Sequence, residues 1–183
     1  PSRTSAPTPA LDQTFDIQII LGKVRPFLRR LAEAHPQVLI IALDALIAHG
    51  DRHDRNWAVL VPPPDVSEPS FDHAASLGFT LSDELRAEHL RDGTVMKWAE
   101  RGHASRFEHR KGTRWQTLVD LAGDAIRLCG PSTREYWRER ILSLERRTVE
   151  DLFASAPGMT ETAHRFTVEL VKINRERLLD VLA

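Results

Sequence analysis

The sequence predicts a mostly α-helical fold with one small β-hairpin, on three observations. The run VLIIALDALIA at residues 38–48 is apolar at every position but one, and a helix apolar on all sides is usually buried. Beyond residue 80 the chain has helical spacing, punctuated by capping residues and glycine stops. Only residues 56–72 contain a short β-prone run, NWAVLV, followed by the stiff connection PPPD and a second extended piece, SFD.

The first third of the chain contains a tail, one or two further helices and then the buried helix. Residues 1–12 are rich in Pro, Ser, Thr and Ala and are expected to form a flexible tail or linker, so that residues 13–183 make up one lobe. Residues 15–34 predict one or two helices, interrupted at Pro26. The buried helix follows, with Pro36 in its first turn, Gly50 as its stop and Asp44 in need of a buried partner.

After the hairpin, which a turn at Gly78 ends, the remainder is predicted to be helical apart from one loop. A helix begins after the cap Ser82 and ends before Gly93. Residues 99–113 are basic and contain glycines, which indicates a loop. The segment 115–128 has helical spacing, and the next helix has a capping box, Ser132 with Glu135. The last helix spans residues 161–182. Three tryptophans are expected to anchor the core, namely Trp98, Trp115 and Trp137.

Composition describes an ordinary globular protein, with 42% hydrophobic and 28% charged residues. The formal net charge of −1 gives no reason to expect a nucleic-acid or membrane partner. The longest apolar run has 11 residues and is too short to span a bilayer. With one cysteine, Cys129, and no signal peptide at the start, the sequence predicts a cytoplasmic protein.

The stretch HGDRHDRNWAVL at residues 49–60 places many polar groups directly after the buried helix. Asp51 and Asn56 are five residues apart, and Asp72 follows on the far arm of the hairpin. Folding the hairpin back would bring Asp72 near Asn56, and their oxygens suit a hard cation such as Mg²⁺. Asp51 would then be available to orient a hydroxyl or accept its proton. Phosphoryl transfer requires this combination of a base, metal ligands and nearby cations.

The motif D-R-H-D-R-N followed by F-D-H-A-A-S-L-G resembles the catalytic loop and metal-binding segment of HipA-like kinases, and more distantly those of phosphatidylinositol 3-/4-kinases. The resemblance covers about residues 38–78. It implies the C-terminal lobe of a kinase-like fold, with ATP and Mg²⁺ as cofactors and a protein Ser or Thr hydroxyl as acceptor. It also implies a bacterial toxin–antitoxin setting.

The same resemblance assigns roles residue by residue. Asp51 would be the catalytic base, with His53 beside it positioning the substrate or the loop. Asn56 and Asp72 would hold the metal and, through it, the nucleotide. Independently of the family, Arg52 could contact a phosphate in bidentate fashion, the alternative being a surface salt bridge.

The kinase motifs are incomplete in this chain. No glycine-rich phosphate loop precedes Asp51, and Lys23 is the only lysine among the 50 residues before it. We therefore expect the nucleotide-binding N-terminal lobe to lie on another polypeptide or to have been removed from this one. Possible partners are that lobe or an antitoxin chain.

Several other functions fit parts of the sequence. Within the same fold, a lipid or small-molecule kinase is possible, as is a binding module without activity. His49 and His53, beside Asp51 and Asp54, could instead hold a transition metal in a phosphohydrolase. A local excess of positive charge is predicted to form a solvated loop, with docking of an acidic substrate as the alternative; it comprises Lys97, Arg101, Arg106, Arg110, Lys111 and Arg114.

Overall fold

A computed structural model describes residues 38–53, 75–107, 115–154, 156 and 158–183 of the chain. These residues form a mostly helical structure. Its helices are α2 (Val38–Leu46), α3 (Asp83–Arg91), α4 (Val95–Ala99), α5 (Leu118–Leu128), α6 (Pro131–Leu142), α7 (Arg146–Ala154) and α8 (Glu161–Leu182).

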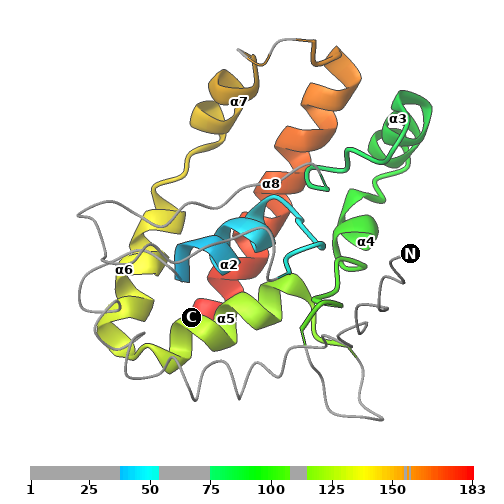
Figure 1. The fold of residues 1–183 in the computed structure, drawn as a ribbon. Helices are drawn as coiled ribbons and strands as arrows, with labels where there is room; N and C mark the ends of the chain where they lie inside the picture. The colour runs from blue at the N-terminus through cyan, green and yellow to red at the C-terminus, as the bar shows by residue number, and fades with distance from the viewer. Residues whose placement is uncertain (1–37, 54–74, 108–114, 155, 157) are drawn as a thin grey trace, which may run out of the picture.

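Helix α8 organises the described structure, because the six other helices all pack against it (Figure 1). Its N-terminus is capped by Thr160, whose Oγ1 accepts a hydrogen bond from the Ala163 backbone N–H at 3.1 Å. Large side chains along its whole length are fully buried, among them Phe166, Leu170, Leu178 and Leu182. Helix α8 is therefore the main element of the core, although residues such as Glu176 and Asp180 keep part of it at the surface.

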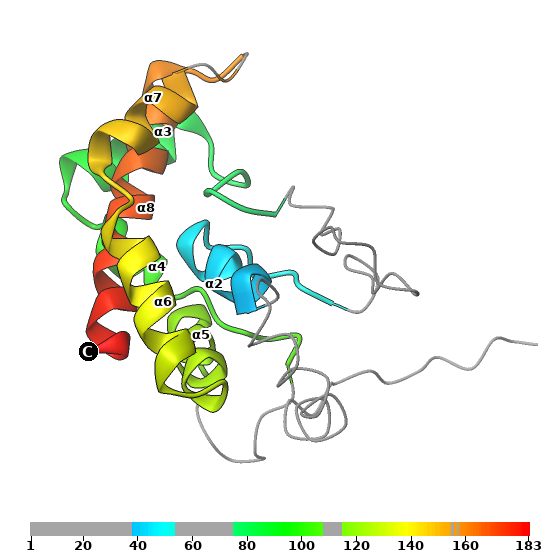
Figure 2. The same ribbon diagram turned by 90° about the vertical axis from the view of Figure 1, so that its left-hand side faces the viewer.

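Figure 2 shows α7 beside the N-terminal part of α8 and α5 beside its C-terminal part. The apolar core follows α8 from one end to the other. Its largest cluster joins α2, α5, α6 and the C-terminal half of α8. A second cluster surrounds Phe166, whose ring meets the Trp98 ring edge-on at a centroid distance of 5.4 Å. A third cluster packs α7 against α8 through Val149 and Val168.

Three sequence-predicted features have the expected form. Helix α8 spans the predicted residues 161–182. Helix α3 begins after Ser82, whose hydroxyl accepts from the Leu85 N–H at 3.4 Å. Beyond its last turn Gly93 has φ +64°, the left-handed conformation that ends many helices. Trp98 and Trp137 pack partly buried against the core, as predicted.

The prediction that Gly50 ends the buried helix is wrong. Helix α2 ends at Leu46, and Ala48 takes the left-handed conformation with φ +53°. The His49 N–H then bonds back to the Asp44 carbonyl at 2.8 Å, which closes the helix in the pattern that glycine usually permits. The helix is also less uniformly buried than predicted, since Ile40, Ala42 and Ala45 are buried whereas Leu43 and Leu46 are half-buried.

Three further predictions need correction. The capping box is not formed, because α6 begins at Pro131, which puts Ser132 inside the helix and makes Gly130 the cap residue. Helix α4, which was not predicted, ends at Ala99, so the loop predicted over residues 99–113 begins only after that residue. Trp115 is 47% exposed instead of anchoring the core, although its ring meets the His103 ring edge-on.

The predicted hairpin over residues 56–72 lies outside the described residues. Within the part that the structure describes, there is no β-strand, only an isolated antiparallel bridge between His103 and Thr117. Among the described helices, none is both long and apolar enough to cross a membrane.

Candidate active site around Asp51

The candidate site begins where α2 ends, and neighbouring segments fix that end in place. Buried Asn174 of α8 donates a hydrogen bond from Nδ2 to the Leu46 carbonyl at 3.2 Å. The Leu77 N–H donates to the Ile47 carbonyl at 2.7 Å. Both acceptors are carbonyls at the C-terminal end of α2, where no further helical N–H is available to satisfy them. The loop after α2 therefore starts from a fixed position.

Asp44, for which the sequence predicts a buried partner without identifying it, pairs with Arg52. Arg52 donates from Nε to Asp44 Oδ2 at 2.7 Å and from Nη2 to Oδ1 at 2.6 Å. Both side chains are 3% exposed. This bidentate geometry matches a planar guanidinium to a carboxylate, and it ties the residue after Asp51 to the core.

Arg52 therefore forms a buried ion pair, and the surface salt bridge considered from the sequence is wrong. Its predicted contact with a nucleotide phosphate stays a prediction. In this geometry Nε and Nη2 point inward to Asp44, so the clearest effect of Arg52 is to hold the loop.

Asp51, one residue before Arg52, lies at the surface instead of in the core. Its carboxylate is 42% exposed and pairs with Arg106, which is 56% exposed. Arg106 donates to Asp51 Oδ1 from Nε at 2.8 Å, and its Nη2 lies 2.7 Å from the same oxygen. An exposed carboxylate with a guanidinium beside it can accept a proton from a hydroxyl and lies near a positive charge that suits a phosphoryl group.

The chain returns toward the site through residues 75–80, after the predicted metal-binding segment. Gly78 has φ +67°, and a Cβ added to it would lie 2.6 Å from the Phe166 ring. The backbone there therefore approaches α8 more closely than another residue would allow. Leu77 also has a positive φ, +57°, and the Ser76 side chain is buried. The turn expected at Gly78 is confirmed, and it lies against the core.

The structure brings together some of the predicted site residues and leaves others undescribed. Asp51 and Arg52 lie in the loop that follows α2, five and six residues after its last residue Leu46, and His53 follows them half-buried. Asn56 and Asp72 lie outside the described residues, so their predicted metal site stays a prediction. Among the residues described, no three His, Cys, Asp or Glu side chains group to hold a metal, and the His49 side chain is fully buried.

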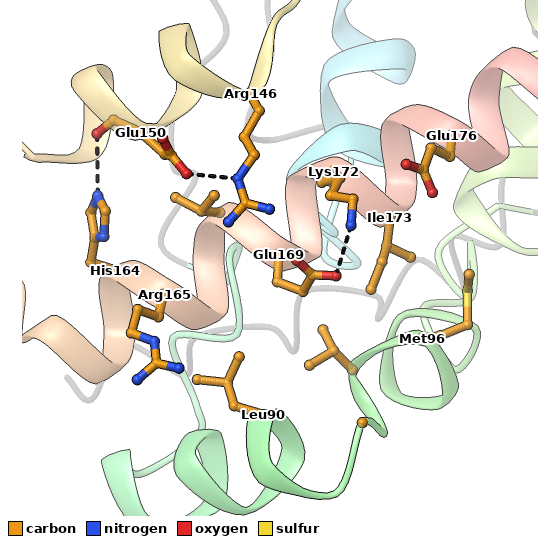
Figure 3. Close-up of a pocket in the computed structure, with 13 residues that line it drawn as sticks. Leu90, Met96, Arg146, Glu150, His164, Arg165, Glu169, Lys172, Ile173 and Glu176 are labelled. Carbon is orange, nitrogen blue, oxygen red and sulfur yellow. Dashed lines mark hydrogen bonds and ion pairs between the residues drawn. The ribbon is translucent and has the colours of Figure 1, made fainter.

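A separate pocket of about 510 Å³ lies between α3, α4, α7 and α8 (Figure 3). Leu90, Met96 and Ile173 provide apolar walls. The charged groups at its edge are largely paired: Arg146 donates to Glu150 at 2.7 Å, and Lys172 lies 3.3 Å from Glu169. None of residues 49–53 lines this pocket, so it is distinct from the Asp51 site.

Sequence reasoning does not find the pairing of Arg106 with Asp51. The basic segment that contains Arg106 suggests a possible docking loop, but nothing in a pattern of local spacing identifies a partner 55 residues away.

No protein-family model, curated protein or solved structure matches this chain.

Proposed function

We propose that this chain is the catalytic lobe of a HipA-like kinase, which transfers the γ-phosphoryl group of ATP to a protein Ser or Thr hydroxyl. The observation that carries the proposal is the placement of Asp51. The loop motif D-R-H-D-R-N begins five residues after the end of the core helix α2, with its second residue bound to Asp44 and its first residue, Asp51, at the surface. A base on a rigid element is what phosphoryl transfer needs, because that reaction depends mostly on positioning.

The proposed roles divide between the described loop and the segment beyond it. Asp51 accepts the proton of the substrate hydroxyl as its oxygen attacks the γ-phosphorus. Arg52 keeps the loop backbone on α2 through its bond to Asp44. His53, next in the chain, contributes to the shape of the loop.

Asn56 and Asp72 would hold Mg²⁺, since an amide oxygen and a carboxylate oxygen are ligands that this hard cation accepts. When bound, Mg²⁺ neutralises charge on the phosphate oxygens. The two residues belong to a motif whose first members, Asp51 and Arg52, have the arrangement described above.

The proposal is tested by measuring phosphotransfer from γ-labelled ATP to protein with the full-length gene product. Transfer should require Mg²⁺, and Asp72→Ala should abolish it. A matched control is Asp65→Ala, which removes an aspartate of the same segment outside the motif and should retain activity.

Other outcomes separate the competing functions. A tightly held zinc, iron or manganese together with phosphoester hydrolysis would indicate a phosphohydrolase. Absence of both phosphotransfer and hydrolysis would indicate a binding module. Phosphotransfer that is unchanged in Asp72→Ala would refute the assigned metal ligand.

A further inference from the structure

We propose that Arg106 is the positioning residue of the Asp51 site: its guanidinium holds the Asp51 carboxylate in the orientation that receives the substrate proton. This inference rests on the proposed function and adds a residue that lies outside the kinase-like motif. It also assigns a role to the segment 102–107, which the sequence identifies only as part of a basic loop.

The first argument is the geometry of the pair. Two nitrogens of Arg106 approach the same oxygen, Asp51 Oδ1, at 2.8 and 2.7 Å. Two donors converging on one oxygen restrict rotation of the carboxylate more than one donor would. Because both side chains are around half exposed, the pair is expected to contribute little to folding stability. Its main consequence is therefore the orientation of Asp51.

The second argument is that Arg106 itself stands on an anchored loop. Ala104 is buried, and its N–H donates to the Gln116 carbonyl at 2.9 Å. The Phe107 N–H donates to the Ala104 carbonyl at 3.0 Å, and the Phe107 ring packs against the main core cluster. Ala104 and Phe107, which flank Arg106, are thus held to the rest of the fold by these contacts, and this places Arg106 beside Asp51.

The third argument is that the two loops are direct neighbours. A Cβ added to Gly50 would lie 3.8 Å from the His103 carbonyl oxygen, which is ordinary van der Waals contact. Only about the width of one side-chain carbon separates Gly50 from the His103 carbonyl, so residues 49–53 and 102–107 run close together where the ion pair joins them. Because the loop of Arg106 is anchored to the core, its guanidinium fixes the Asp51 carboxylate relative to the core and not only relative to the loop 102–107.

The proposed step is balanced without any change in Arg106. The substrate hydroxyl oxygen forms a bond to the γ-phosphorus while the bond from that phosphorus to the bridging oxygen breaks, and ADP leaves with the electron pair. The hydroxyl proton passes to the Asp51 carboxylate. Arg106 takes no part in the proton transfer and keeps its contact with Asp51 Oδ1.

The test compares Arg106→Gln with Arg106→Lys in the full-length gene product. Arg106→Gln should lower kcat for phosphotransfer by about 10- to 100-fold, since small misplacements of catalytic groups have effects of that size, and should leave the KM for ATP nearly unchanged. Arg106→Lys restores a charge and should recover part of kcat. The matched control is Arg101→Gln, an exposed arginine of the same loop, which should retain the parent kcat.

Two measurements distinguish a positioning role of Arg106 from a purely structural one. The thermal unfolding midpoint of Arg106→Gln should stay close to that of the parent. In an Asp51→Asn background, Arg106→Gln should have almost no further effect on kcat, because residues that act as a unit are not additive.

Opposite results overturn the inference in distinguishable ways. If Asp51→Asn is inactive but Arg106→Gln retains the parent kcat, Arg106 is not a positioning residue and the proposed function survives. An equal loss of kcat in Arg101→Gln, or a full additional loss in the Asp51→Asn background, would likewise show that Arg106 does not position Asp51. A parent protein without phosphotransfer overturns both proposals.

Discussion

Arg52 and Asp44 form a buried bidentate ion pair, with bonds of 2.7 and 2.6 Å, that ties the loop after α2 back to the helix itself. Asp44 is the one charged residue in an otherwise apolar helix, and Arg52 provides its counter-charge. Because Arg52 directly follows Asp51 in the chain, the pair holds the backbone from which the Asp51 side chain reaches the surface. It is costly to break, because either charge left alone would stay buried without compensation.

The first prediction is that Asp44→Asn destabilises the protein by about 3–5 kcal/mol, because it leaves the Arg52 charge buried without an opposite charge. Denaturant unfolding measures the loss. The control, Asp124→Asn, removes an exposed ion pair with Arg127 and should change the free energy of unfolding by less than about 1 kcal/mol. Replacing both buried partners, Asp44→Leu with Arg52→Met, should restore most of the stability. If Asp44→Asn and Asp124→Asn lowered the free energy of unfolding by equal amounts, the claim that Asp44 and Arg52 form a buried pair would be contradicted.

The second prediction concerns the core face of α2. Ile40 is 6% exposed, so Ile40→Ala should cost about 2–5 kcal/mol of unfolding free energy. Leu43 is half-buried, and Leu43→Ala should cost clearly less. Thermal or denaturant unfolding of the two variants decides the order. If Leu43→Ala lowered the free energy of unfolding more than Ile40→Ala, the face of α2 that contains Leu43 would be the one packed on the core.

The third prediction tests the unusual stop of α2. Ala48 has φ +53°, which an L-residue adopts at a cost, so Ala48→Gly should be neutral or stabilise the protein by up to about 1 kcal/mol. Gly93→Ala makes the reverse exchange after α3, where φ is +64° and a Cβ would meet nothing within 4 Å; it should destabilise by about 1 kcal/mol. If Ala48→Gly and Gly93→Ala both lowered, or both raised, the free energy of unfolding measured with denaturant, this explanation of the α2 end would be contradicted.

The fourth prediction is a pH dependence at Cys129. Burial raises the pKa of this half-buried thiol, because the thiolate loses hydration in the folded state. The unfolded chain therefore releases the proton first, and the stability contribution of the neutral thiol falls as pH rises above the ordinary thiol pKa. Between about pH 8 and pH 10 the parent should lose more stability than Cys129→Ala. Parallel pH profiles for the two proteins would contradict the burial argument.

Local sequence patterns predict the helices whose ends are set by nearby residues. Ser82 and Gly93 mark α3 because capping depends on contacts within a few residues. The same logic fails at α6, where Ser132 and Glu135 match a capping box but Pro131 already starts the helix. It fails at Gly50 as well, since Ala48 takes the left-handed turn instead.

The candidate site can be predicted in outline because its motif is contiguous in the sequence. Asp44 can be identified as needing a partner, since a lone carboxylate in an apolar helix is costly. The sequence does not show that this partner is Arg52 or that Asp51 contacts Arg106. Both contacts depend on the path that the loop after α2 takes in the folded structure. A contact across 55 residues is fixed by the packing of α2 on α5 and α8, which no local spacing encodes.

The central claim is that Asp51 is the general base of a phosphotransfer reaction, and its most direct test is the turnover of Asp51→Asn in the full-length gene product. The amide keeps the size of the side chain and removes its negative charge. We expect kcat to fall by about 10²–10⁴-fold with the KM for ATP nearly unchanged. The exposed residue Asp180 provides the control, and Asp180→Asn should match the parent. Full turnover by Asp51→Asn would contradict the claim.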